Sequence, residues 1–183
     1  MKNSTKLILL IVVFIIILAG AMFGYQYLSD KTSPETPNIT LSADTAKNFT
    51  VYDYNGNAYK LSDFFGKPIV LNFWATWCGP CQAEMPSFQK AYEKYSDNVV
   101  FLMVNLTDGT DETVDDVIDF IKNNGYTFPV YCDTEYSAAY AYSVYSIPKT
   151  VFINKDGSVL TVHSGMITEE RLNSYIDAIS ESD

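Results

Sequence analysis

Two cysteines separated by Gly-Pro, Cys78 and Cys81, are the strongest candidates for catalytic residues in this chain. They follow an apolar, strand-like stretch over 68–73 and precede a helix-like stretch over 82–95. The free N–H groups and the positive dipole end of a helix N-terminus favour thiolate over thiol. Thiolate is the nucleophile of disulfide exchange. We therefore expect Cys78 to attack a disulfide, and Cys81, shielded about one turn further in, to resolve the mixed disulfide.

Metal binding is the first alternative for this pair. A structural zinc site needs four ligands, and the remaining candidates are Cys132 and His163, which lie far from Cys81 and do not form a second close pair. Dithiol redox chemistry is therefore favoured over zinc. A copper-binding assembly module would need a three-residue spacer between its cysteines and a histidine; His163 keeps this alternative open.

Peroxidase chemistry is a second alternative. A peroxiredoxin-like site would have a threonine three positions before its cysteine and an arginine nearby. Thr76 lies only two positions before Cys78, and the only arginine of the chain, Arg171, belongs to the predicted last helix. The peroxidase interpretation is therefore disfavoured.

Two motifs carry a family resemblance. The run Trp-Cys-Gly-Pro-Cys over 77–81 resembles the thioredoxin-fold active site, and its context over 70–86 resembles the TlpA/ResA group of membrane-tethered thiol-disulfide oxidoreductases. Ser-Ile-Pro-Lys-Thr-Val-Phe-Ile over 146–153 resembles the cis-proline segment of that fold. The resemblance runs from about Phe49 to the C-terminus. It implies an α/β thioredoxin fold: a mixed central sheet flanked by helices, with an N-terminal β-hairpin and an extra strand and helix at about 99–131.

The resemblance also implies substrate-binding residues. Pro148 would be cis, would present the backbone of Ile147 to an extended substrate and would keep metal off the thiols; the alternative is an ordinary loop proline. Trp77 would lie exposed beside the disulfide, whereas Trp74 is expected to pack in the core.

Glu84 is the third catalytic candidate. It lies three residues after Cys81 on the same predicted helix, so both side chains can face one side. The resemblance implies that it tunes the thiols, and the alternative is a solvated carboxylate. Asn72 stands where ordinary thioredoxins have an aspartate beneath the disulfide. A neutral amide cannot take the proton that Cys81 must lose, so we expect Glu84 or water to take it.

Strands and helices that alternate early and end in an antiparallel hairpin and a helix predict a mixed sheet between helices. The helix over 82–95 is expected to kink at Pro86, and the acidic residues that begin the helix over 111–123 suit its positive dipole end. The predicted strands cover 49–52, 58–60, 68–73, 99–106, 126–131, 150–154 and 158–162; the predicted helices cover 82–95, 111–123, 137–143 and 168–179, with a helical turn over 61–65.

The N-terminus predicts a membrane anchor. Lys2 and Lys6 precede an uncharged stretch over 7–29, which as a helix would span about 34 Å, enough for a bilayer core. The lysines predict an N-in orientation. The alternative is a signal peptide cleaved after the small residues 19–21. We therefore expect a transmembrane signal anchor over 1–29, a flexible linker over 30–46 and a thioredoxin-like domain over 47–183.

Charge limits the partners. The chain has 22 acidic residues against 12 basic ones, a net charge of −10, and every acid follows the predicted span. This balance argues against nucleic acid and anionic lipid as partners. Cys132 is unpaired, and we expect a buried, structural side chain rather than a third redox centre.

The sequence therefore predicts an extracytoplasmic thiol-disulfide oxidoreductase. It needs no cofactor beyond the Cys78–Cys81 disulfide, and its substrates are disulfide-containing proteins. The Gly-Pro spacer resembles that of reducing thioredoxins, so we favour a reductase, with a disulfide-forming oxidase as the alternative. The resemblance implies a membrane electron donor of the CcdA/DsbD type, and cytochrome c maturation is one candidate setting among several that the sequence does not separate.

Overall fold

The computed structural model describes residue 18 and residues 45–181. The predicted anchor, apart from Leu18, and most of the predicted linker lie outside the described residues. Within the described part of the chain, no helix combines the length and the apolar character needed to cross a membrane.

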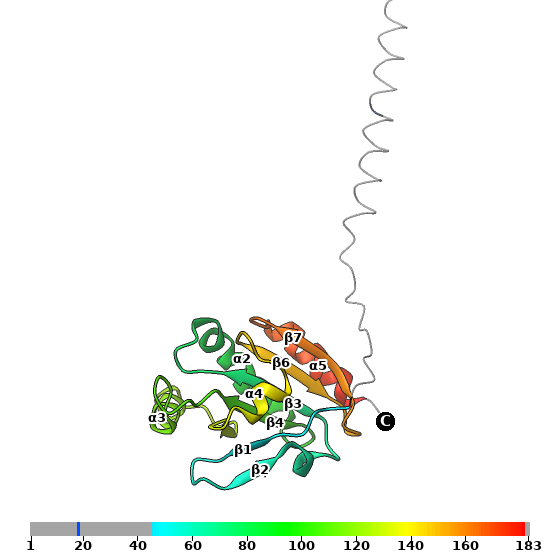
Figure 1. Cartoon of the computed structure of the whole chain (residues 1–183). Coiled ribbons are helices and arrows are strands. Elements are labelled where there is room, and N and C mark those ends of the chain that lie inside the picture. The colour runs from blue at the N-terminus through cyan, green and yellow to red at the C-terminus, as the bar shows by residue number, and fades with distance from the viewer. Residues whose placement is uncertain (1–17, 19–44, 182–183) are drawn as a thin grey trace, which may run out of the picture. The chain divides into compact units, whose positions relative to one another are not determined.

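A seven-stranded mixed sheet forms the centre of the domain (Figure 1). Its order is β2-β1-β5-β4-β3-β6-β7. The central strand β3 pairs in parallel with β4 and antiparallel with β6. The strands are β1 Thr50–Tyr52, β2 Ala58–Lys60, β3 Ile69–Trp74, β4 Val100–Asn105, β5 Val130–Cys132, β6 Lys149–Ile153 and β7 Val159–Ser164.

Helices cover both faces of this sheet, as the predicted fold class requires. One hydrophobic cluster joins the sheet to α2, α3 and α5, and a second joins it to η1 and α4. The helices are the 3₁₀ helix η1 Leu61–Phe64, α2 Gly79–Tyr95, α3 Val114–Asn124, α4 Ser137–Ala141 and α5 Glu169–Ser180.

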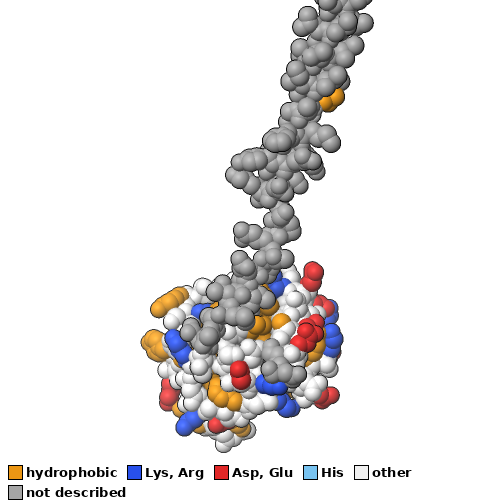
Figure 2. Space-filling view, turned by 90° about the vertical axis from the view of Figure 1, so that its right-hand side faces the viewer, with side chains coloured by type: hydrophobic (Ala, Val, Ile, Leu, Met, Phe, Trp, Pro, Cys, Tyr) orange, Lys and Arg blue, Asp and Glu red, His pale blue; other side chains and the backbone are white. Residues whose placement is uncertain are grey.

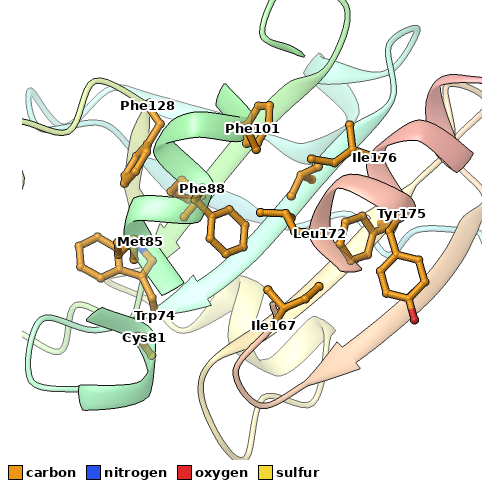
Figure 3. Close-up of a cluster of buried hydrophobic side chains, with 14 of the residues drawn as sticks. Trp74, Cys81, Met85, Phe88, Phe101, Phe128, Ile167, Leu172, Tyr175 and Ile176 are labelled. Atoms are coloured by element: carbon orange, nitrogen blue, oxygen red, sulfur yellow. The ribbon is translucent and has the colours of Figure 1, made fainter. Parts of the chain in front are cut away.

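Strand β3 supplies side chains to both clusters. Val70 and Trp74 belong to the first cluster, and Leu71 and Phe73 to the second. Side chains alternate across a strand, so a strand buried on both faces is a continuous apolar run. Figure 3 shows the first cluster, with Cys81 at its edge next to Trp74. The cysteine pair is thus fixed to the main core, and Trp74 packs there as expected.

Helix α2 begins three residues before the predicted start, at Gly79, because Cys78 itself is the N-cap. Proline lacks an N–H and fits the first turn of a helix, so Pro80 is compatible with this start. The helix continues through Pro86 to Tyr95. Thr45, at the end of the predicted linker, forms an isolated antiparallel bridge with Ser158.

Helix α3 begins three residues later than predicted. Thr113 is its N-cap, and the Asp116 side chain completes a capping box. Asp111 and Glu112, which we expected in the first turn, therefore lie outside the helix. Its end at Gly125, which has a φ of 70°, agrees with the predicted stop.

The domain surface carries both signs of charge. On the face drawn in Figure 2, lysine and arginine side chains lie among aspartates and glutamates and do not gather into one patch. A phosphate backbone is bound by clustered cations, and the described residues of this face offer no such cluster.

Candidate active site

The two cysteines form a disulfide at the start of α2, with their Cα atoms 5.2 Å apart. Cys78 is the N-cap, and its Sγ accepts a hydrogen bond from the Cys81 backbone N–H at 3.2 Å. Cys78 is 4% exposed and Cys81 is fully buried. A disulfide partner can therefore approach only the Cys78 sulfur without rearrangement of the helix.

A cis-proline loop lies beside this helix start. The Ile147–Pro148 peptide bond is cis, which confirms that prediction. The next residue, Lys149, pairs with Phe73 near the end of β3 that leads into the cysteine loop. Trp77 is 61% exposed, as expected. Together with Ile147 it lines a shallow hollow, whose other residues are Leu106, Val144, Tyr145 and Ser146.

Glu84 is buried, so the solvated-carboxylate alternative is wrong. Its Oε1 accepts a hydrogen bond from Asn72 Nδ2 at 3.0 Å, and its Oε2 accepts one from the Ile167 backbone N–H at 2.9 Å. Burial raises the pKa of Glu84 to about 7, against the opposing effect of these two hydrogen bonds. A carboxyl group with that pKa can take up and release a proton near neutral pH.

Asn72 couples Glu84 to the sheet. Its Nδ2 also donates to Thr150 Oγ1 at 3.1 Å, whereas its buried Oδ1 has no partner among the described residues. A protonated Glu84 would be an O–H donor, and a half-turn of the Asn72 amide would offer Oδ1 to it. A hydrogen bond between Glu84 and Asn72 can thus form in both protonation states of Glu84.

A second buried glutamate, Glu112, was missed by sequence reasoning. Its carboxylate accepts hydrogen bonds from Thr76, two residues before Cys78, and from Asn105 at the end of β4. The sequence feature that could have indicated this site is Asn105, a polar residue at the carboxyl end of an otherwise apolar central strand. Functional groups often lie at the carboxyl ends of parallel strands.

The remaining cysteine and the histidine lie on two other strands of the sheet, β5 and β7. Cys132 is a free, buried thiol at the end of β5, and burial raises its pKa. His163 lies on β7, with its Nε2 3.3 Å from the Met166 carbonyl oxygen. Among residues 45–181, no three histidine, cysteine or acidic side chains are grouped to hold a metal ion.

A disulfide that caps the helix after a central parallel strand, next to a cis-proline loop, defines a dithiol oxidoreductase of the thioredoxin fold. Comparison with known proteins gives the narrower class. The AhpC/TSA family matches residues 43–162. The chain belongs to this family, and it is a ResA-like thiol-disulfide oxidoreductase.

Two relatives and two solved structures support this placement. The thiol-disulfide oxidoreductase ResA of Bacillus thuringiensis subsp. konkukian (strain 97-27) is 36% identical over 169 residues, which cover 92% of this chain and 94% of the relative. ResA of Bacillus subtilis (strain 168) is 38% identical over 135 residues, 73% of each chain. The crystal structure of StoA from Bacillus subtilis has a TM-score of 0.62 at 30% identity, covering 72% of this chain and 97% of StoA. The exposed lipoprotein thioredoxin of Streptococcus pneumoniae strain TIGR4 has a TM-score of 0.61 at 29% identity, covering 71% of this chain and 98% of its own.

Proposed function

We propose that this oxidoreductase is a reductase of protein disulfides. The observation that carries the exchange chemistry is the placement of the pair: Cys78 is the helix N-cap and retains some exposure, and Cys81 is buried behind it. The Gly-Pro spacer, which resembles that of reducing thioredoxins, supports this direction over disulfide formation.

The reaction has two exchange steps. The Cys78 thiolate attacks one sulfur of a client disulfide, a Cys78–client bond forms, and the other client sulfur leaves as a thiolate that takes a proton. Cys81 then loses its proton and attacks Cys78 Sγ, which forms the Cys78–Cys81 disulfide and releases the second client thiolate. Two electrons pass from the dithiol to the client.

Substrate contact is assigned to Trp77, Ile147 and Pro148. The hollow that Trp77 and Ile147 share would receive the client residues next to its disulfide. The Ile147 backbone, set by the cis bond to Pro148, would pair with the client as an added strand does.

Proton transfer is assigned to Glu84. Its raised pKa, about 7, suits a group that takes the Cys81 proton during the second step. Asn72 cannot accept that proton, but it can hydrogen-bond Glu84 before and after the transfer. Glu84 thus replaces the aspartate that ordinary thioredoxins place beneath the disulfide.

The proposed setting is the outer side of a cell membrane. Residues 1–29 would anchor the chain with its N-terminus inside, and the dithiol on the outer side would be reduced again by a membrane electron donor of the CcdA/DsbD type. Labelling of intact cells with a membrane-impermeant maleimide, after mild reduction, tests this setting. The chain should be labelled without lysis, and a Cys78→Ser variant should not; label that appears only after lysis contradicts the proposal.

The redox potential tests the direction. The full chain, carrying Cys132→Ser and held in detergent, is equilibrated with a thiol buffer, and the reduced fraction is measured. A Cys78–Cys81 potential near the thioredoxin value of about −270 mV is expected for a reductase. A value towards about −120 mV would identify an oxidase instead.

A further inference from the structure

Glu112 is fully buried in the loop between β4 and α3. Its Oε1 accepts hydrogen bonds from the Thr76 backbone N–H and from Asn105 Nδ2, each at 2.6 Å. Its Oε2 accepts one from Thr76 Oγ1 at 2.5 Å. Burial of a carboxylate costs a large free energy unless hydrogen-bond donors replace the water molecules that it loses. Here three donors do so, and two of them belong to Thr76.

Thr76 is held through all of its polar groups. Glu112 binds its N–H and its hydroxyl, and the Gln82 side chain donates to its carbonyl oxygen. One residue earlier, the Ala75 carbonyl accepts the Cys78 N–H at 3.2 Å. The segment that leads from β3 into the reactive cysteine is therefore held at Thr76 by two side chains, Gln82 of α2 and Glu112 of the loop between β4 and α3.

The loop that carries Glu112 is organised by hydrogen bonds of its own. One side-chain oxygen, Asp108 Oδ1, accepts hydrogen bonds from three consecutive backbone N–H groups, those of Thr110, Asp111 and Glu112, at 2.7, 2.8 and 3.0 Å. The Gly109 N–H donates to the Glu112 carbonyl at 3.0 Å. Glu112 thus enters the core from a backbone held by these four hydrogen bonds.

Asn105 joins this loop to the sheet. It lies opposite Trp74 in the parallel β3–β4 pair. Its Oδ1 accepts a hydrogen bond from Thr107 Oγ1 at 2.7 Å, which orients the amide so that Nδ2 faces Glu112. The carboxyl end of β4 and the cysteine loop that follows β3 are therefore connected through one carboxylate.

We propose that Glu112 is a positioning residue for thiol-disulfide exchange. Through Thr76 it holds the segment over 75–78 so that Cys78 and the exposed Trp77 face an incoming disulfide. The role applies to either direction of exchange, so it extends beyond the proposed reductase function.

The test compares Glu112→Ala with Glu112→Gln in the full chain in detergent, on a Cys132→Ser background. A glutamine oxygen can take the place of Oε1, and its amide can donate to the Thr76 hydroxyl, so the connection survives without the charge. The rate at which reduced Cys78 reacts with iodoacetamide and with oxidised glutathione is measured at several pH values. Fluorescence anisotropy and acrylamide quenching follow Trp77, since Trp74 is buried.

We expect Glu112→Ala to slow both reactions about tenfold or more, because a misplaced nucleophile loses rate steeply. Glu112→Gln should stay within about threefold of the wild type, and only Glu112→Ala should loosen Trp77. Thr76→Val, which removes the hydroxyl but keeps the backbone bond, should slow exchange about threefold and shows the effect in a less perturbed protein.

Wild-type rates in both Glu112→Ala and Thr76→Val would overturn the proposal and leave Glu112 a support of the fold alone. Equal losses in Glu112→Ala and Glu112→Gln would also overturn it, because charge rather than hydrogen bonding would then matter. A Cys78–Cys81 potential in the oxidase range would reject the reductase function without touching these rates.

Discussion

Two buried glutamates contact the elements that carry the cysteines, and their surroundings differ. Glu84 lies on the cysteine helix itself, accepts two hydrogen bonds, and adjoins an Asn72 oxygen that has no partner among the described residues. Glu112 lies outside that helix, accepts three hydrogen bonds, and joins the end of β4 to the loop before Cys78.

These different surroundings suit the two glutamates to two different tasks, proton transfer and alignment of the nucleophile. The Glu84 site can accommodate a proton, since burial raises the pKa of Glu84 to about 7 and Asn72 can reorient. The Glu112 carboxylate instead accepts hydrogen bonds from Thr76 and Asn105, and these bonds hold the loop before Cys78 in place. One carboxyl group therefore suits proton transfer and the other suits alignment of the nucleophile.

Replacement of each glutamate by leucine should separate the sites most strongly. Glu112→Leu leaves the Thr76 N–H and Asn105 Nδ2 buried without their acceptor, which should lower the free energy of unfolding by about 3 kcal/mol or more. Glu84→Leu leaves the Ile167 N–H unpaired, but it also removes a carboxyl group that is costly to ionise, so about 1 kcal/mol is expected at pH 8. Urea unfolding of the oxidised proteins measures both. A larger loss in Glu84→Leu would reverse the assignment.

The pH dependence of stability should show the Glu84 titration. Its folded-state pKa, about 7, lies above the ordinary value of 4.5, so the folded state binds more protons than the unfolded state between these pH values. The stability contribution is complete below about pH 4.5 and is lost as pH rises through 7, up to about 3 kcal/mol.

Glu84→Gln should remove that decline from the urea-unfolding curve measured at pH 5 to 8. Burial also raises the pKa of Asp133, so the informative quantity is the difference between the two pH curves. Ala83→Gln, an exposed change on the same helix, is the matched control and should keep the wild-type slope. Parallel curves for wild type and Glu84→Gln would show that Glu84 does not titrate in this range.

Glu84, unlike Glu112, should make the rate of disulfide exchange depend on pH. If Glu84 takes the Cys81 proton, it must be ionised, so the wild-type rate of the second step rises as pH passes 7. Glu84→Gln should lack this rise and be about tenfold slower at pH 8. Stopped-flow reduction of a small disulfide across pH gives the profile. A wild-type profile in Glu84→Gln would remove Glu84 from the mechanism.

The two glutamates also differ in whether their positions could be predicted from the sequence. Glu84 could be proposed because its distance from Cys81 is set within one helix, where a spacing of three residues implies a shared face. The strand before the cysteines was predicted over 68–73 and observed over Ile69–Trp74, since a doubly buried strand is a continuous apolar run. Local patterns of this kind, together with the family resemblance, predicted most of the fold.

Glu112 could not be found in this way. An acid near a helix start ordinarily faces solvent and the helix dipole, and Glu112 was assigned to that role. The Asp108 side chain instead ends the preceding turn with three backbone bonds, which moves the helix start past Glu112. Its partner Thr76 is 36 residues away, and only the parallel pairing of β3 with β4 brings them together.

Replacement of Cys132 should have the smallest effect on stability and on the rate of exchange. It tests whether the hydrogen-bond network around Glu112 extends to β5. It pairs with Asn105 in the β4–β5 register, and the Thr107 hydroxyl interacts with its thiol. If Cys132 only fills space, Cys132→Ala should cost about 1 kcal/mol of stability and leave exchange within about twofold of wild type, with the potential unchanged. Unfolding and glutathione exchange measure the two quantities. A tenfold loss of rate, as expected for Glu112→Ala, would extend the positioning network to β5, whereas a shifted potential would make Cys132 a third redox group.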